Sequence, residues 1–368
     1  MKKNIVLISG HHINSKRKAG FHWIALSLSK KYEVTFITAP IRYSTLISKD
    51  HRTSYFKFSE INKPIKVGTI TSYVYMTLAN PISSKHKFIA PFFNLFVIFY
   101  GSITPKNLKN IFSNADVIIF ESNDALLLFD KISRINPVAK KIYRVSDDLK
   151  TINASKVVQN YEAKISSKFD LISVPSEYIY HKFDHLPQTK LLNHGIHKKL
   201  FSKIYRIPKE YVQFEINILF VGTSHFDHNF LSVASSLFPN WGFHIIGPIE
   251  KINKEKNIRY YGELPFNETI PYIQHADIGL QTRKSDIGLA SLSDSLKVLQ
   301  YTYCRLPIIA PKEVNSSRIN FFYYIPGDRD SIQIALTEAI NFDRTKIDVS
   351  KINSWDEVAE LIINEVLR

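Results

Sequence analysis

Four clusters of polar residues directly follow short apolar runs, and they bring together carboxylate, imidazole and hydroxyl groups. The clusters are Ser9-Gly10-His11-His12, Glu121-Ser122, Ser146-Asp147-Asp148 and Gly222-Thr223-Ser224. The apolar runs before them are rich in β-branched and aromatic residues, which is typical of buried parallel strands. Ligands of doubly wound sheets bind beyond the carboxyl ends of the strands. The spacing therefore predicts that these clusters form ligand-binding edges.

The motifs of several common enzyme classes are missing from the sequence. It has no Walker loop, G-x-G-x-x-G, H-E-x-x-H or G-x-S-x-G, so kinase, dinucleotide oxidoreductase, zincin and hydrolase functions lack support. His11, His12 and His22 lack the carboxylate or thiolate company of a structural metal site. Asp328-Arg329-Asp330 resembles a metal-binding D-x-D motif, but it follows Pro326-Gly327, and we expect a turn and a helix N-cap there. We expect no metal and no cofactor.

The positive charge of the chain lies in its first half. The net charge of the 368 residues is +15, but residues 1–205 hold 31 Lys and Arg against 13 Asp and Glu, whereas residues 206–368 hold 17 against 20. This asymmetry indicates an anionic partner for one domain: nucleic acid, a phospholipid surface or a phosphorylated substrate. A lysine-rich surface without such a partner is the alternative. No nucleic-acid-binding module is recognisable, so we expect no nucleic acid.

One apolar segment has two possible interpretations. Phe88–Tyr100 (FIAPFFNLFVIFY) is interrupted only by Pro91 and Asn94, and lysines flank it on both sides. Because no run reaches 18 apolar residues, the sequence predicts no membrane-spanning helix. A run of this length is either a buried core element or an interfacial segment with aromatic side chains in lipid and lysines at the headgroups.

The intervening elements predict an α/β fold of two doubly wound domains. Short apolar runs alternate with helical patterns, and the alternation restarts after Phe201–Glu210. The strands are predicted at residues 4–9, 33–39, 115–122, 141–146, 170–175, 216–221, 243–246, 259–262, 277–281 and 306–310. We therefore expect a first domain over residues 1–205, a second over 206–345, and a final helix within 346–368 that crosses back to the first.

Cysteine usage and the N-terminal residues bear on the cellular compartment. Cys304 is the sole cysteine, which excludes a disulfide framework and fits a reducing compartment. The first residues, MKKNIVLISG, lack an apolar signal core and a cleavage site, so secretion is not expected.

The second half resembles the nucleotide-sugar domain of GT-B glycosyltransferases. The resemblance rests on YGEL at 261–264, on PYIQHADIGLQT, and on SDSLKVLQYTYCRLPIIAP, which reads as a helix and the following strand. Retaining members carry Glu-x7-Glu in this region, but the corresponding positions here are Leu292 and Gln300. The retaining signature is therefore absent.

The whole chain from Ile5 to Pro326 resembles the GumK family of glucuronosyltransferases of xanthan assembly, glycosyltransferase family 70. The blocks ADVIIFES, INPVAKKIYRVSDDLKTIN, NHGIHKKLF, SHFDHNF, FHIIG, YYGE and SLKVLQY carry the resemblance in order, while residues 40–110 have diverged. The resemblance implies a GT-B architecture, with two Rossmann-like domains facing across a cleft. It also implies an inverting, metal-independent enzyme that transfers glucuronic acid from UDP-glucuronate to a polyprenyl-diphosphate-linked oligosaccharide in bacterial exopolysaccharide or capsule synthesis. Another UDP-sugar as donor and a sugar-nucleotide epimerase remain the alternatives.

The resemblance also implies roles for individual residues of the donor site. The family's catalytic base falls on Asp147; Asp148 stands where the family has glycine, and we expect it to cap the following helix. Lys297 corresponds to the lysine that contacts the diphosphate. Arg283 replaces the family's tyrosine and could pair with the carboxylate of glucuronate. The other expected donor-site residues are Thr223, Ser224, Glu263, Ser295, Leu296 and Gln300.

The first domain is expected to bind the acceptor and the membrane. An acceptor with a diphosphate in an anionic leaflet accounts for the basic first half, so we expect peripheral association with the cytoplasmic face of the bacterial inner membrane. The residues expected to contact the acceptor or the membrane are His11, Lys16, Arg17, Lys18, Phe92, Phe93, Phe96 and Glu121.

Overall fold

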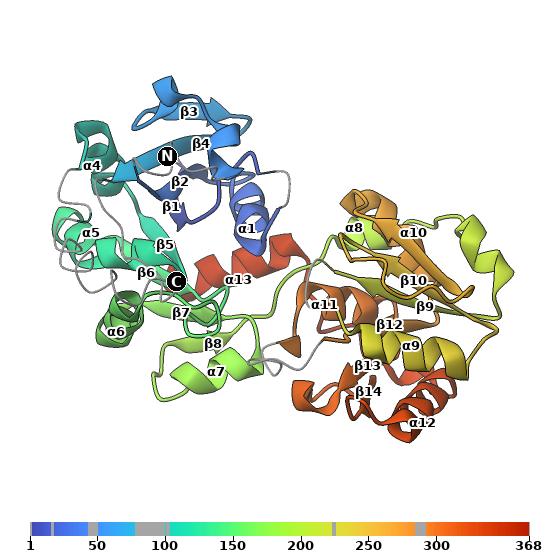
Figure 1. Ribbon diagram of the computed structural model, residues 1–368. Helices are drawn as coiled ribbons and strands as arrows, with labels where there is room; N and C mark the ends of the chain where they lie inside the picture. The colour runs from blue at the N-terminus through green and yellow to red at the C-terminus, as the bar shows by residue number, and fades with distance from the viewer. Residues whose placement is uncertain are drawn as a thin grey trace, which may run out of the picture. The chain divides into compact units, whose positions relative to one another are not determined.

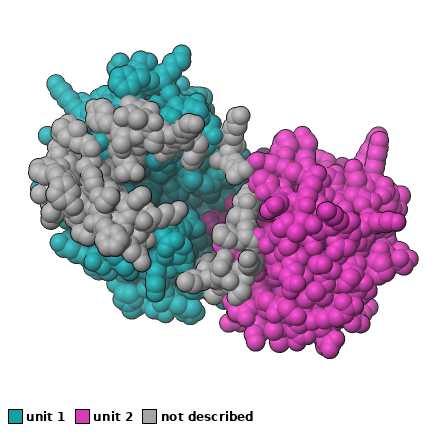
Figure 2. Space-filling model, viewed as in Figure 1, with its two compact units in different colours: residues 1–192, 355–368 teal, residues 193–354 magenta. Residues whose placement is uncertain are grey.

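The computed structural model describes residues 2–15, 18–42, 51–77, 100, 104–222, 226–283 and 292–367. The chain forms two compact units, which Figure 2 shows in different colours. Unit 1 comprises residues 1–192 and 355–368, and unit 2 comprises residues 193–354. The division between the units therefore falls at residue 192 and not at the predicted residue 205. The reason is that the segment after residue 192 packs on unit 2, where Gln274 Nε2 donates to the carbonyls of Phe201 and Lys203, both at 2.7 Å.

Unit 1 is built on an eight-stranded sheet with the strand order β3-β4-β2-β1-β5-β6-β7-β8 (Figure 1). All neighbouring strands are parallel except the β3–β4 hairpin. The strand order reverses between β1 and β5, so a doubly wound sheet binds ligands at the carboxyl ends of these two strands. The strands are β1 Asn4–Ser9, β2 Glu33–Arg42, β3 Pro64–Val67, β4 Ile70–Thr77, β5 Val117–Glu121, β6 Lys140–Arg144, β7 Leu171–Val174 and β8 Thr189–Leu191.

Helices pack against the sheet of unit 1 through its buried alternate residues. α4, α5, α6 and α7 share one core cluster with Ile8, Phe120 and Val145 of the sheet region. α1 instead meets β2, where Phe21 and Phe36 lie 6.3 Å apart, centroid to centroid. The helices are α1 Gly20–Leu28, α4 Lys106–Ser113, α5 Phe129–Ile135, α6 Lys156–Ile165 and α7 Glu177–Phe183, with the 3₁₀ helices η1 His51–Tyr55, η2 Phe58–Glu60, η5 Asp124–Leu128 and η6 Ser166–Lys168.

The last helix, α13 Trp355–Leu367, belongs to unit 1 although the chain before it belongs to unit 2. It packs against α1, and Trp355 and Ile362 are among its buried residues. In the turn after α1, Lys30 donates to Asp356 at 2.5 Å, and Lys31 pairs with Glu360. Unit 1 is therefore completed only by the C-terminal end of the chain.

Unit 2 contains a six-stranded parallel sheet in the order β11-β10-β9-β12-β13-β14. This is the 3-2-1-4-5-6 order of Rossmann folds, with its switch point between β9 and β12. α10 and α11 cover one face of the sheet, while α9 and α12 pack in the core cluster of the other face. The elements are β9 Ile216–Val221, β10 Trp241–Ile246, β11 Ile258–Gly262, β12 Ile278–Leu280, β13 Ile308–Pro311, β14 Phe321–Tyr324, α8 Lys198–Phe201, α9 His228–Leu237, α10 Phe266–His275, α11 Leu296–Tyr303, α12 Arg329–Ile340, η7 Lys209–Gln213, η9 Lys312–Val314 and η10 Arg344–Lys346.

Two sequence predictions concern segments outside the proposed ligand-binding edges: the D-x-D sequence and the apolar segment Phe88–Tyr100. Asp328 caps α12 by accepting from the backbone N–H groups of Asp330 and Ser331 at 3.0 and 3.1 Å, so the D-x-D sequence is a turn and N-cap as expected. Of the apolar segment Phe88–Tyr100, only Tyr100 lies within the described residues, and it is buried in the core of unit 1. Within the described parts of the chain, no helix is both long and apolar enough to cross a membrane.

Candidate active site

Glu121 joins the carboxyl ends of three neighbouring strands at the switch point of unit 1. Its Oε2 accepts hydrogen bonds from the Ser9 hydroxyl at 2.6 Å, the Gly10 N–H at 3.2 Å and the Asn123 amide at 3.3 Å. Its Oε1 accepts from the Ser146 hydroxyl at 3.2 Å. The side chain is only 5% exposed. Glu121 was expected to contact an acceptor, but these bonds place it beneath the surface, where it fixes the loops after β1, β5 and β6.

Asp147 follows this cluster and presents a carboxyl group at the surface. Its backbone N–H donates to the Ser122 hydroxyl at 3.0 Å, which fixes the loop after β6 to the end of β5. Within the described residues, its carboxyl oxygens have no hydrogen-bond partner. Surrounding protein atoms desolvate the carboxyl group and, with the negative charge of Glu121, raise the pKa of Asp147, while the nearby His11 opposes the shift. A carboxylate with these properties can act as a general base.

Asp148 points away from this surface into a buried ionic network. Its Oδ1 accepts from Lys182 Nζ at 2.8 Å and from the Lys150 N–H at 3.2 Å. Lys182 also donates to Glu162 at 2.7 Å, and the Tyr143 hydroxyl donates to the same carboxylate at 2.5 Å. The pKa of Lys182 is raised, because the two carboxylates outweigh its desolvation. Asp148 is therefore held as a structural anion, while Asp147 is left available.

The other residues predicted on the first domain are only partly described. His11 is exposed beside Asp147, and its ring centroid lies 5.4 Å from that of His22. Lys18 donates from Nζ to the carbonyl of Ile13, so its ammonium is engaged with its own loop. Lys16, Arg17, Phe92, Phe93 and Phe96 lie outside the described residues.

Lys297 lies at the switch point of unit 2. It is on the first turn of α11, and its Nζ lies 4.2 Å from the centroid of the Phe220 ring of β9. A Cβ added to Gly222 would lie 2.7 Å from that ring and 3.4 Å from Lys297 Nζ, so glycine keeps the end of β9 open. Desolvation and the positive charge of Arg283 lower the pKa of Lys297 to about 7. An ammonium group in this state gains strongly from an anionic ligand.

Packing fixes the position of Lys297 on the sheet. One turn further along α11, the Tyr301 hydroxyl donates to the Leu219 carbonyl at 3.2 Å and accepts from the Val221 N–H at 3.1 Å. A Cβ at Gly279 of β12 would lie 2.4 Å from the Tyr301 ring, so glycine allows this close approach. The helix is therefore fastened to both strands of the switch point.

Three consecutive residues after β12 carry buried polar atoms that have no partner among the described residues. These atoms are Gln281 Oε1, Thr282 Oγ1 and Arg283 Nε, and Gln281 and Thr282 are 1% and 2% exposed. Buried polar atoms are rarely left unsatisfied, so this cluster is typical of a site that a ligand completes. The amide nitrogen of Gln281 donates to the Ser295 hydroxyl at 3.1 Å, which connects the cluster to the start of α11.

The remaining donor-site predictions are placed on the same edge of unit 2. Ser295 is the N-cap residue of α11, Leu296 and Gln300 are partly exposed on that helix, and Glu263 is exposed directly after β11. Thr223 and Ser224 lie outside the described residues.

Sequence reasoning missed Gln281, Thr282 and Gly247. Gly247 directly follows β10 with φ +137°, and a Cβ there would lie 1.7 Å from the carbonyl oxygen of Gly222. The signal for Gly247 was its position after the apolar run FHII, and the signal for Gln281 was its position at the end of a predicted strand. Neither residue belongs to a local motif. Across the parts of the chain that the structure describes, no three His, Cys, Asp or Glu side chains are grouped as metal ligands.

Two comparisons relate the chain to known sequences. Residues 7–175 match the family described as "Glucuronosyltransferase GumK, N-terminal domain". The chain is also 27% identical over 362 residues to the UDP-glucuronate:glycolipid 2-beta-glucuronosyltransferase of Xanthomonas campestris pv. campestris, and the match covers 98% of this chain and 89% of the relative.

Solved structures with similar folds are glycosyltransferases of the GT-B class. The sucrose-phosphate synthase of Thermosynechococcus elongatus has a TM-score of 0.57 at 12% identity, covering 100% of this chain and 95% of that one. The α,α-trehalose-phosphate synthase of Burkholderia xenovorans has a TM-score of 0.54 at 10% identity, covering 99% and 96%. At such low identity these similarities show the fold alone, and the fold is GT-B.

Proposed function

We propose that this chain is a GumK-like glucuronosyltransferase, which transfers glucuronic acid from UDP-glucuronate to a lipid-linked saccharide. The observation that carries the proposal is the pair of switch-point sites. Unit 1 presents the carboxyl group of Asp147, which has no hydrogen-bond partner among the described residues, beside His11, and unit 2 presents the basic side chains of Lys297 and Arg283. A base and an anion-binding site are the two elements that sugar transfer from a nucleoside diphosphate requires.

Asp147 is proposed as the general base. An acceptor hydroxyl transfers its proton to the Asp147 carboxylate while its oxygen forms a bond to the anomeric carbon of the donor. The bond from that carbon to the diphosphate breaks, and UDP leaves with the electron pair. A single displacement of this kind inverts the anomeric configuration, so the proposed enzyme is inverting.

Lys297 is proposed to stabilise the leaving diphosphate. Because its pKa is lowered to about 7, the free protein holds the ammonium only in part at neutral pH, and an adjacent diphosphate restores the proton. Ser295 adds a hydroxyl at the start of α11, where the helix dipole also favours negative charge. These groups stabilise the negative charge on the leaving diphosphate, so the proposed reaction proceeds without a metal ion.

Arg283 is proposed to select the sugar. Its Nε is buried and has no hydrogen-bond partner in the part of the chain that the structure describes, and its charge acts on Lys297, which supports a role beside the proposed diphosphate site. A guanidinium group pairs with carboxylates in a bidentate geometry, and glucuronate is distinguished from glucose by its carboxylate. Thr223, Ser224, Glu263, Leu296 and Gln300 are proposed to complete the contacts with UDP.

Unit 1 is proposed to bind the acceptor and to contact the membrane. The basic first half of the sequence favours a lipid-diphosphate acceptor in an anionic leaflet, with peripheral association at the cytoplasmic face of the inner membrane. The product would serve exopolysaccharide or capsule synthesis. Lys16, Arg17 and Lys18, together with the segment around Phe92, Phe93 and Phe96, are the proposed contacts.

The proposal is tested by incubating the protein with a panel of UDP-sugars and measuring release of UDP, with and without a bacterial glycolipid extract. We expect UDP-glucuronate to give the fastest release, and the glycolipid to increase it. Release from UDP-glucose alone would assign another donor and remove the role of Arg283. Conversion of the UDP-sugar into its epimer without release of UDP would replace the transferase by an epimerase.

A further inference from the structure

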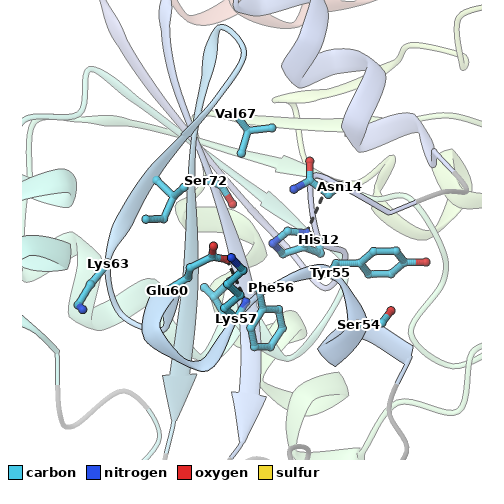
Figure 3. A pocket seen from close by; sticks show the side chains of 12 residues that line it. His12, Asn14, Ser54, Tyr55, Phe56, Lys57, Glu60, Lys63, Val67 and Ser72 are labelled. Atoms are coloured by element: carbon cyan, nitrogen blue, oxygen red, sulfur yellow. Dashed lines mark hydrogen bonds between the residues drawn. The ribbon is translucent and has the colours of Figure 1, made fainter.

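A pocket of about 250 Å³ lies on unit 1 between the β3–β4 hairpin and the short helices η1 and η2 (Figure 3). Ser72 and Val74 line it from β4, and because they are two residues apart they share one face of the strand. Tyr55 and Phe56 line it from the end of η1 and the loop after it, and His12 lines it from the loop after β1. The proposed transfer reaction gives this pocket no role.

The pocket borders the edge of the sheet that carries Asp147. Arg52 of η1 donates from Nη1 to the Gly10 carbonyl at 3.1 Å, and the Gly10 N–H in turn donates to Glu121. The pocket residue His12 directly follows His11, whose charge acts on Asp147. The loop after β1 therefore connects the pocket with the surface near Asp147.

The lining of the pocket combines aromatic rings with charged groups of both signs. The His12 ring lies nearly parallel to the Tyr55 ring, with centroids 6.1 Å apart, and 5.7 Å from the Phe56 ring. Lys57 and Lys63 supply cations and Glu60 supplies an anion. The hydroxyl groups of a neutral sugar can donate to Glu60 and accept from the lysines, so a sugar can use charged groups of both signs.

His12 supplies a further hydrogen-bond donor. Its Nδ1 accepts from the Asn14 N–H at 3.1 Å, so the ring proton of the neutral imidazole lies on Nε2. Desolvation lowers the pKa of His12 to about 4, with Glu60 opposing the shift and Lys18 supporting it, so the ring is neutral at pH 7. Among the described residues, Nε2 has no hydrogen-bond partner although the residue is 3% exposed.

We propose that this pocket binds a neutral sugar ring of the acceptor other than the ring whose hydroxyl group reaches Asp147. The inference rests on the proposed transferase function for the identity of the ligand as an acceptor, but the binding of sugar by the pocket can be tested without it. The pocket then selects acceptors that carry at least two sugars.

Binding is measured by saturation-transfer NMR on the full-length protein with methyl glucopyranoside, galactopyranoside and mannopyranoside, each as both anomers. We expect at least one glycoside to bind, and Phe56→Ala to weaken its binding about fivefold by removing an aromatic ring from the lining. Phe58→Ala is the matched control, because Phe58 lies two residues further along, is 71% exposed and does not line the pocket. Its binding should equal that of the wild type.

A second variant is needed because Phe56 also packs against Ile41, Val74 and Met76, so that Phe56→Ala could weaken binding through local unfolding. Glu60→Gln keeps an oxygen to accept from the Lys57 N–H, a bond of 3.0 Å, but removes the charge. It should weaken glycoside binding about fivefold and leave the folding unchanged. Binding that is equal in the wild type, Phe56→Ala and Glu60→Gln would overturn the proposal, as would binding of inorganic phosphate without binding of any glycoside.

Kinetic measurements distinguish failure of the sugar subsite from failure of the proposed transferase function. With a disaccharide-bearing glycolipid, Glu60→Gln should raise KM for the acceptor about fivefold and leave kcat unchanged; with a single-sugar glycolipid it should change neither. An equal effect on both acceptors would contradict the subsite. If the protein transfers no sugar at all, the NMR measurement still decides whether the pocket binds one.

Discussion

Two carboxylates at one sheet edge, Glu121 and Asp147, have opposite surroundings. Glu121 is buried and accepts hydrogen bonds on both oxygens, whereas Asp147 is exposed at the rim and has no partner among the described residues. Carboxylates with unlike environments can take unlike roles in one site. A buried anion that raises the pKa of its neighbour makes that neighbour a better proton acceptor, as long as the neighbour stays ionised at the working pH.

Removal of the Asp147 charge should stop catalysis and leave the protein folded. We expect Asp147→Asn to lower turnover by at least ~10²-fold, the usual scale for a lost general base. UDP affinity should be unchanged, because UDP is assigned to the other unit. Asp148→Asn is the control: it removes the negative charge that pairs with Lys182 and should lower thermal stability while the folded fraction keeps its turnover. If Asp147→Asn has normal turnover and Asp148→Asn has none, the general base is Asp148 and not Asp147.

Glu121→Gln should change the pH dependence of the reaction. The variant keeps one side-chain oxygen that can accept from Ser9 and Gly10, but it removes the charge that raises the pKa of Asp147. The base works when ionised, so activity is lost as the pH falls through its pKa. With a lower pKa of Asp147, the acidic limb of kcat/KM should move to lower pH. An unmoved limb would show that Glu121 acts on the loops alone.

Lys297→Ala should weaken the binding of UDP but not of uridine, because only the diphosphate loses its cation. A hydrogen bond to a charged group contributes about 1.5–3 kcal/mol, so we expect UDP affinity to fall roughly 10- to 100-fold. In the wild type, the pKa of Lys297 is about 7, and UDP binding should take up a proton and weaken as the pH rises above 7. Calorimetry in buffers of different ionisation enthalpy measures that uptake. Equal losses for UDP and uridine would make Lys297 structural.

At the scale of elements, the residues that meet at each site come from separate strands and helices. Strands β1 and β9 have the predicted bounds, because their apolar runs are continuous and bounded by polar residues. β4 was not predicted, although ITSYVYMT is rich in β-branched and aromatic residues, because it lies in the diverged region. The side chains of Gln281 and Thr282 could not be assigned from sequence, since β12 meets β9 only through a strand order that no local pattern encodes.

The ionic network of Asp148, Lys182 and Glu162 fastens α6 and α7 to the loop that presents Asp147. Lys182→Met leaves two nearly buried carboxylates, 8% and 4% exposed, without their cation. We expect a loss of about 2–3 kcal/mol in the free energy of unfolding, below the range for fully buried pairs because Lys182 is partly exposed. Urea unfolding measures the loss.

Lys140→Met provides the comparison for that variant. Its ion pair with Asp170 is more exposed, 48% and 31%, so the change should cost no more than about 1 kcal/mol. Equal losses in the two variants would show that the buried network contributes no more than a surface pair.

At the scale of the whole molecule, charge and connectivity single out unit 1. Unit 1, which the chain completes through α13, holds 29 Lys and Arg against 17 Asp and Glu, and unit 2 holds 19 against 16. The segment Phe88–Tyr100 has two interpretations, and Tyr100 at its end is 6% exposed in the core of unit 1. That burial supports the core interpretation for Tyr100 alone.

Binding to lipid vesicles decides between the two interpretations. We expect the protein to bind anionic vesicles peripherally and to be released by salt, because each lysine near the surface contributes about 1 kcal/mol and is screened within a Debye length. Replacement of Phe92, Phe93 and Phe96 by Ser should abolish vesicle binding and leave the protein folded if the segment inserts into lipid. If the three rings are core, the same change should unfold unit 1 at a cost of several kcal/mol. Circular dichroism beside vesicle sedimentation separates the outcomes, and an unfolded variant would rule out the membrane contact.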